Sequence, residues 1–194
     1  MLCPCGEVSV DFPSLSSLVT LRALRNGYEA IKMMEIRAAQ FPQQLEIVRD
    51  IFREYANSLA IDLDFQDFDA ELANLPGKYA VPRGNVFLAW SNGEVIGGVA
   101  MRPIEGDVCE MKRLYVRPAG RGQQLGRQLA TFMIQAAKEA GYNKVRLDTI
   151  PDMTAARQLY ASLGFRPIPA YIFNPVAGAI FLELDLSASD GMAD

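Results

Sequence analysis

Residues 117–127 form a glycine-rich segment that joins two regular patterns of the sequence. The stretch before it, Val108–Val116, is mainly apolar and typical of a strand, and after it apolar residues recur at helical spacing from Leu125 to Ala137. A strand that leads through glycines into a helix presents free backbone N–H groups and the positive end of the helix dipole. Such a junction can bind an anion without any side chain. The segment therefore predicts an α/β fold with an anion site at this junction.

The other patterns place strands first in hairpins and then in alternation with helices. Asn92-Gly93 supplies the positive φ angles of a tight hairpin turn, Pro103–Asp107 is expected to turn the chain again, and Pro42 suits the first turn of a helix. The predicted strands are Glu35–Ala38, Val86–Trp90, Val95–Met101, Val108–Val116, Val145–Asp148 and Ile180–Leu186, and the predicted helices are Pro42–Leu59, Asp67–Leu75, a helix from Leu125 that ends at Gly141, and Thr154–Leu163. This order predicts an α/β (α+β) class, with a mixed sheet flanked by helices on both faces.

The length of 194 residues suffices for one ordinary domain with short extensions. We expect three parts along the chain: a loosely structured N-terminal extension at 1–32, a domain at 33–187 and a C-terminal tail at 188–194. Met33 or Met34 is expected to be the original start, and a secretory signal is not expected because Glu7 stands where a basic region should be. No apolar run of the sequence approaches the ~20 residues of a membrane span, so we expect no membrane partner.

Histidine is absent from the sequence. This excludes Ser-His-Asp and Cys-His catalysis and nearly all zinc sites, and leaves proton transfer to Glu, Asp, Tyr, Lys, Cys or water. Cys3, Cys5 and Cys109 build neither a disulfide framework nor a four-ligand metal site, so we expect no metal and a reducing, cytoplasmic setting. The net charge of −4 argues against general nucleic-acid binding.

The spacing of the glycines excludes two common nucleotide-binding motifs. A P-loop reads G-x-x-x-x-G-K-[ST], and neither that spacing nor the Lys-Ser/Thr ending is present. A dinucleotide fingerprint reads G-x-G-x-x-G, whereas Gly120, Gly122 and Gly126 read G-x-G-x-x-x-G. The anion at this junction is therefore expected to belong to another class of ligand.

The segment resembles [QR]-x-x-G-x-[GA], the pyrophosphate-binding motif of the GNAT N-acetyltransferase superfamily. Arg121, Leu125 and Gly126 match, while Gln124 stands where that family usually has its first glycine. Downstream, Ala156–Phe165 resembles the second family signature, A-x-x-L-Y-x-x-L-G-F, at about the right distance. Two signatures in the right order are far more specific than one, so the chain is identified as a bacterial-type, single-domain member of this superfamily.

The resemblance implies a GNAT-like, mostly antiparallel sheet and acetyl-CoA as co-substrate, with no metal. Leu114, Tyr115 and Val116 are expected to pair through their backbone with the pantetheine arm. The implied contacts to the rest of the cofactor come from the loop, the helix start and the second signature: Arg121, Gly122, Gln123, Gln124, Leu125, Gly126, Arg127 and Ala156. Met153 departs from the family, because many relatives carry an asparagine there that contacts the cofactor arm.

Two residues are candidates for catalysis by the same resemblance. Tyr160 is expected to return a proton to the leaving thiolate, since a phenol of pKa ~10 can donate to a thiolate whose conjugate acid has a pKa near ~8.5. Glu110 is the candidate general base, and its alternative is a charged residue on the solvent face of a strand. Cys109 is expected to be a buried structural thiol, with no histidine to activate it.

The acceptor is expected to be a small-molecule amine or a peptide amine, attacked on acetyl-CoA directly in a ternary complex. Tyr55–Leu75 and Pro169–Pro175 should line its site, and four carboxylates in the first segment would suit a cationic amine or simply face solvent: Asp62, Asp64, Asp67 and Asp69. A monomer or homodimer is expected. Two alternatives stay open: a non-catalytic acyl-CoA-binding sensor or interaction module, and a pure protein-interaction domain.

Overall fold

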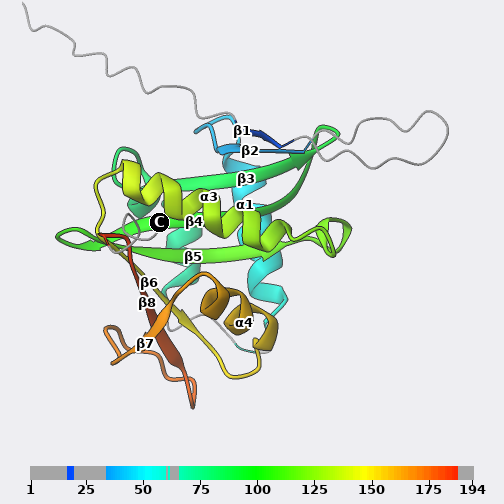
Figure 1. The fold of residues 1–194 in the computed structure, drawn as a ribbon. Helices are drawn as coiled ribbons and strands as arrows, with labels where there is room; N and C mark the ends of the chain where they lie inside the picture. The colour runs from blue at the N-terminus through cyan, green and yellow to red at the C-terminus, as the bar shows by residue number, and fades with distance from the viewer. Residues whose placement is uncertain (1–16, 20–33, 60, 62–65, 188–194) are drawn as a thin grey trace, which may run out of the picture.

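The computed structural model describes residues 17–19, 34–59, 61 and 66–187, and within them an eight-stranded sheet forms the centre of the fold (Figure 1). Its strands are β1 (Ser17–Val19), β2 (Met34–Ala38), β3 (Asn85–Ser91), β4 (Glu94–Glu105), β5 (Val108–Val116), β6 (Lys144–Thr149), β7 (Arg166–Ile168) and β8 (Ile180–Asp185). They lie in the order β1-β2-β3-β4-β5-β6-β8-β7, and among these described strands β5 and β6 form the one parallel pair. The predicted mixed, mostly antiparallel sheet is confirmed.

Helices cover both faces of this sheet, as predicted (Figure 1). They are α1 (Leu45–Asn57), α2 (Phe68–Ala73), α3 (Leu125–Glu139) and α4 (Thr154–Ser162), with short 3₁₀ turns η2 (Gly77–Tyr79) and η3 (Pro118–Gly120). Side chains alternate across β3, so Val86 and Leu88 pack with α1 and α2, and Phe87 and Ala89 pack with α3. Because alternate residues of β3 point to opposite faces of the sheet, this strand contributes to two separate apolar layers.

Three predicted details of the elements are confirmed or corrected. The hairpin between β3 and β4 turns at Asn92 and Gly93, with φ of 52° and 82° as predicted. Pro42 does not open the helix: the Leu45 N–H donates to the Pro42 carbonyl in a turn, and α1 begins at Leu45. The turn expected at Pro103–Asp107 is also shorter, because β4 continues through Pro103 beside a register shift where a sheet accommodates proline.

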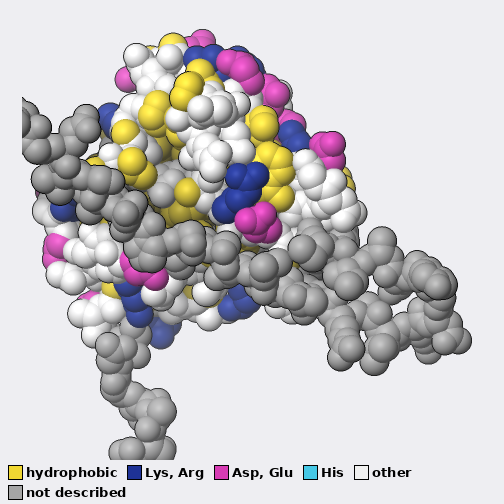
Figure 2. Space-filling view, turned by 90° about the horizontal axis from the view of Figure 1, so that it is seen from above, with side chains coloured by type: hydrophobic (Ala, Val, Ile, Leu, Met, Phe, Trp, Pro, Cys, Tyr) yellow, Lys and Arg dark blue, Asp and Glu magenta, His cyan; other side chains and the backbone are white. Residues whose placement is uncertain are grey.

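The expected N-terminal extension falls mostly outside the described residues, as does the C-terminal tail 188–194. Ser17–Val19 is described, and it pairs antiparallel with β2. None of the described helices is both long and apolar enough to cross a membrane. On the face shown in Figure 2, side chains of both charges are interspersed with hydrophobic ones.

Candidate active site

The site is built where β5 and β6 separate. The described pairing of these strands covers three positions: Val108 with Lys144, Cys109 with Val145 and Glu110 with Arg146. Beyond Glu110, β5 bulges at Arg113, which has a φ of 58°, and its register on β4 shifts between Gly98 and Ala100. A cavity of about 580 Å³, including the open space at its mouth, lies where the two strands part.

The cavity is lined by side chains from both faces of the sheet. The lining comprises Tyr55, Leu59, Ile61 and Gln66 from α1 and the chain after it, Met111–Leu114 from β5, Leu147–Ile150 from β6 and the residue after it, Met153 and Tyr160 from α4 and its start, and Asn174. Of the two segments expected to line the acceptor site, the first thus contributes three residues besides Tyr55 and the second contributes Asn174. The cavity thus lies between side chains from the two faces of the sheet, at the point where β5 and β6 part.

Tyr160 reaches the cavity from α4. Its ring lies 5.7 Å from that of Phe165, and 7% of the residue is exposed. Burial raises the pKa of the Tyr160 hydroxyl, and the neighbouring Tyr55 and Asp148 raise it further. The hydroxyl is therefore protonated at neutral pH, which is the form a proton donor requires.

The glycine-rich loop leads from β5 through η3 to the start of α3 at Leu125. The first backbone N–H groups of α3 have no partner within the helix, and they point toward the loop. Gly120 is closely packed, since a Cβ there would lie 2.9 Å from the Leu125 side chain and 3.1 Å from the Ile96 carbonyl oxygen. A Cβ on Gly126 would meet no atom closer than 3.8 Å. The junction thus has a rigid base and an open helix start.

Two arginines flank this helix start. Arg121 Nε donates to the Val116 carbonyl at 3.4 Å, and the Arg127 guanidinium donates to the Ser162 hydroxyl on α4. Arg121 is thus held against the end of β5, and Arg127 ties α3 to α4. An anion at this point would meet the free N–H groups of the helix start.

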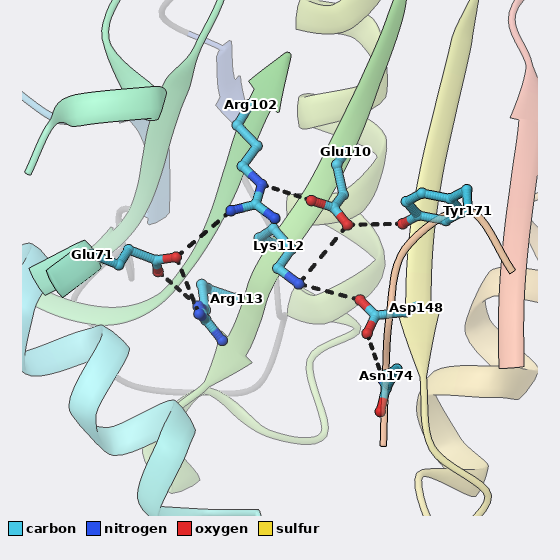
Figure 3. A network of polar contacts seen from close by, with 8 residues as sticks. All are labelled: Glu71, Arg102, Glu110, Lys112, Arg113, Asp148, Tyr171 and Asn174. Carbon is cyan, nitrogen blue, oxygen red and sulfur yellow. Dashed lines mark hydrogen bonds and ion pairs between the residues drawn. The ribbon is translucent and has the colours of Figure 1, made fainter. Parts of the chain in front are cut away.

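Eight residues form a polar network beside the cavity (Figure 3). Glu110, with 1% of its side chain exposed, accepts a hydrogen bond from Arg102 Nε at 2.6 Å and another from the Tyr171 hydroxyl at 2.8 Å. Lys112 Nζ lies 3.9 Å from the same carboxylate. Glu110 is thus buried and held by three groups, and it is not among the residues that line the cavity.

Asp148 is the carboxylate of this network that does line the cavity. Lys112 Nζ lies 3.2 Å from its Oδ1, and Asn174 Nδ2 donates to its Oδ2 at 2.8 Å. Burial alone would raise the pKa of Asp148, but Lys112 and Asn174 outweigh burial and hold this pKa below its usual value. Lys112 therefore bridges β5 and β6 across the point where the strands part.

The family model described as the Acetyltransferase (GNAT) family matches residues 41–165. This chain belongs to the GNAT acetyltransferase family. It is 38% identical over 156 residues to an uncharacterized N-acetyltransferase of Schizosaccharomyces pombe, an alignment that covers 79% of this chain and 96% of the relative. The predicted superfamily is confirmed, and with it an acetyl-CoA-dependent N-acetyltransferase.

Solved structures of GNAT proteins share the fold. A GNAT-family acetyltransferase from Staphylococcus aureus superposes with a TM-score of 0.65 at 22% identity, over 79% of this chain and 99% of that one. An acetyltransferase from Salmonella typhimurium, described with its cofactor acetyl-CoA, superposes with a TM-score of 0.58 at 23% identity, over 81% and 96% of the two chains.

The residues expected to bind acetyl-CoA lie around the cavity and the loop of this GNAT protein. Tyr115 and Val116 pair with Gly98 and Gly97 of β4 on one side, Leu114 lies at the register shift, and no described strand lies along the other edge beyond the split. An open strand edge offers the amide and carbonyl groups that an extended, amide-containing arm requires. Ala156 lies on α4 and packs against the apolar layer next to α3. These positions fit the expected ligand.

The network explains what reasoning from the sequence missed in this GNAT site. Arg102, Glu71, Asp148 and Tyr171 are far apart in sequence, and no motif connects them. In β6, one residue could have indicated the site: Asp148 is ionisable and lies beside the point where β5 and β6 separate. Cys109 is fully buried and burial raises the pKa of its thiol to about 12, which supports the expected structural thiol.

Proposed function

We propose that this protein transfers an acetyl group from acetyl-CoA to a primary amine by direct attack in a ternary complex. The observation that carries the proposal is the protonated Tyr160 hydroxyl at a cavity formed by two separated strands. Acetyl-CoA supplies the activated acyl group when bound. The acceptor is a small-molecule amine or a peptide amine, and no metal takes part.

Tyr160 acts as the general acid. Because burial keeps its hydroxyl protonated, it can donate to the thiolate that leaves when the thioester is cleaved. A free phenol has a pKa of ~10, well above neutral pH, so solvent returns the proton to Tyr160 after each turnover. One buried phenol is enough for this step, which agrees with a sequence that contains no histidine.

The same proposal assigns acetyl-CoA binding to the strand edge and the helix start. Leu114, Tyr115 and Val116 pair with the extended arm through their backbone, and the diphosphate meets the loop and helix start: Arg121, Gly122, Gln123, Gln124, Leu125, Gly126 and Arg127. Ala156 supports the arm from α4. A cytoplasmic setting and a monomeric or homodimeric state complete the proposal.

A non-catalytic acyl-CoA sensor is the second candidate. Gln124 and Met153 favour it, because each replaces a residue that the family uses for cofactor binding. Tyr160 weighs against it, since a sensor needs no proton donor at the cavity.

The test is a thiol-release assay on the full chain with acetyl-CoA and a panel of alkylamines, polyamines, amino acids and peptides. We expect thiol release that requires both substrates, together with an acetylated amine detected by mass spectrometry. Calorimetric binding of acetyl-CoA without thiol release from any amine would favour the sensor. No acetyl-CoA binding at all would favour a protein-interaction domain.

A further inference from the structure

The amine that attacks a thioester must lose a proton, and among the described residues the two carboxylates nearest the cavity are both occupied, while Asp62 and Asp64 lie outside the described residues. Glu110 faces Arg102 from β4, Lys112 from its own strand and Tyr171 from the segment after β7 (Figure 3). Its two oxygens therefore already accept strong hydrogen bonds. It also lies behind the cavity wall, so an acceptor amine in the cavity has no direct contact with it.

Asp148 touches the cavity, but it is a weak base. Lys112 and Asn174 hold it as a carboxylate, and the phenols of Tyr55 and Tyr160 lie near it. A carboxylate whose charged form is stabilised in this way binds an incoming proton poorly. It can orient an amine, but it gives little assistance in removing the proton.

The network also contains equal numbers of cations and carboxylates, so none of its carboxylates is free to act as a base. Three cations, Arg102, Lys112 and Arg113, face three carboxylates, Glu71, Glu110 and Asp148. Glu71 is held by Arg113 through two hydrogen bonds of 2.9 and 3.2 Å. Proton uptake by any one of these carboxylates would leave the buried cluster with more cations than carboxylates.

The other titratable side chains described at the cavity are no better suited. Lys112 and Arg113 are cations in ion pairs, and burial raises the pKa of Tyr55 as well as that of Tyr160. Both phenols therefore carry their protons at neutral pH. Within the part of the chain that the structure describes, no side chain at the cavity is ready to take a proton from an amine.

We infer that this acetyltransferase uses none of its described side chains as a general base and therefore selects weakly basic acceptors, the α-amino groups of amino acids, their conjugates or peptide N-termini, over alkylamines. The inference rests on the proposed function. The neutral amine attacks the carbonyl carbon, the N–C bond forms and the C–S bond breaks. The thiolate takes the Tyr160 proton, the new amide nitrogen loses one proton to water, and water restores the proton of Tyr160.

The size of the preference follows from the ionisation of the amines themselves. At pH 7, about one in eleven α-amino groups of pKa ~8 is neutral, against about one in 2,500 alkylamines of pKa ~10.4. Without a base, only the neutral fraction reacts. The α-amine is then favoured roughly 200-fold by ionisation alone, before any difference in contacts or in the nucleophilicity of the two neutral amines is counted.

The experiment measures thiol release by the full chain between pH 6 and 10 with alaninamide and Nα-acetyl-lysinamide within a wider panel of α-amines and alkylamines. We expect kcat/KM at pH 7 to be about 100-fold or more greater for the α-amine probes. We also expect kcat/KM to rise with pH along the ionisation of each amine. Comparable rates for alkylamines at pH 7, or thiol release from alkylamines alone, would overturn the inference.

Glu110→Gln tests whether Glu110 acts as a general base or as a positioning residue, because the amide keeps the shape of the side chain and loses the basic carboxylate. We expect its kcat to fall while the pH at which kcat/KM rises stays where it is in the wild type. A rise at lower pH in the wild type that is lost in Glu110→Gln would identify Glu110 as the base and contradict us. If Glu110→Gln does not fold, Tyr171→Phe frees one oxygen of Glu110 and must leave the same pH profile.

Glu183→Gln is the matched control, since Glu183 is an ion-paired carboxylate on β8 held by Lys144 and Arg146. Its pH profile should equal that of the wild type. Binding of acetyl-CoA with no thiol release from any amine would refute the proposed function itself, and the inference would fall with it.

Discussion

At the scale of single residues, Thr149 stands out because its hydroxyl is buried at the wall of the cavity. It lies on the same side of β6 as Val145 and Leu147, which pack with α3. Its Oγ1 has no hydrogen-bond partner among the described residues, and 4% of the residue is exposed. An unsatisfied buried hydroxyl costs about 1–3 kcal/mol of stability.

Thr149→Val should therefore stabilise the protein, because valine has nearly the same shape without the hydroxyl. We expect the free energy of unfolding, measured with urea, to rise by about 1 kcal/mol. Thr149→Ser keeps the hydroxyl and removes a methyl group, so it should lower the same free energy. If valine destabilises the protein as much as serine does, the hydroxyl has a partner that this account lacks.

Residues of the site differ in how far the sequence reveals them. Tyr160 was predictable because it stands in a local signature, and the structure places it at the cavity. The surroundings of Glu110 were not predictable, because Arg102 is eight residues away on another strand and Tyr171 is 61 residues away. Neither contact can be seen in the sequence. The sequence alone therefore could not decide whether Glu110 is a general base or a charged residue on the surface.

At the scale of the elements, the start of α3 explains why the family usually has glycine at the position of Gln124. Gln124 has a φ of 55°, in the left-handed region that glycine enters freely and other residues enter at a cost. The position before the helix thus favours glycine for its backbone, and glutamine adopts the same conformation under strain. The departure therefore leaves the path of the loop intact.

Gln124→Gly should relieve this strain. We expect the free energy of unfolding to rise by up to about 1 kcal/mol, and the affinity for acetyl-CoA to stay equal or increase. Asn92→Gly is the control, because Asn92 has a φ of 52° in the hairpin turn, outside the loop proposed to bind acetyl-CoA, and should leave acetyl-CoA affinity unchanged. Weaker acetyl-CoA binding in Gln124→Gly alone would show that the glutamine side chain itself contacts the ligand.

At the scale of the whole molecule, the order of strands and helices was predictable and the shape of the active site was not. Helical periods and the Asn92-Gly93 turn are local signals, so α1, α3 and the hairpin were found. The three-residue strands β1 and β7 are too short to show a pattern of their own. The separation of β5 from β6 after Glu110 and the bulge of β5 at Arg113 are revealed only by pairing across the sheet.

The central claim is that the protonated hydroxyl of Tyr160 serves the leaving thiolate at this split sheet. The most direct test is the kcat of thiol release by Tyr160→Phe, with Tyr79→Phe as control, since the Tyr79 hydroxyl is also buried and has no partner among the described residues. We predict that Tyr160→Phe lowers kcat by about tenfold or more while acetyl-CoA affinity stays within a few-fold, and that Tyr79→Phe keeps the wild-type kcat. A Tyr160→Phe enzyme with wild-type kcat would contradict the claim.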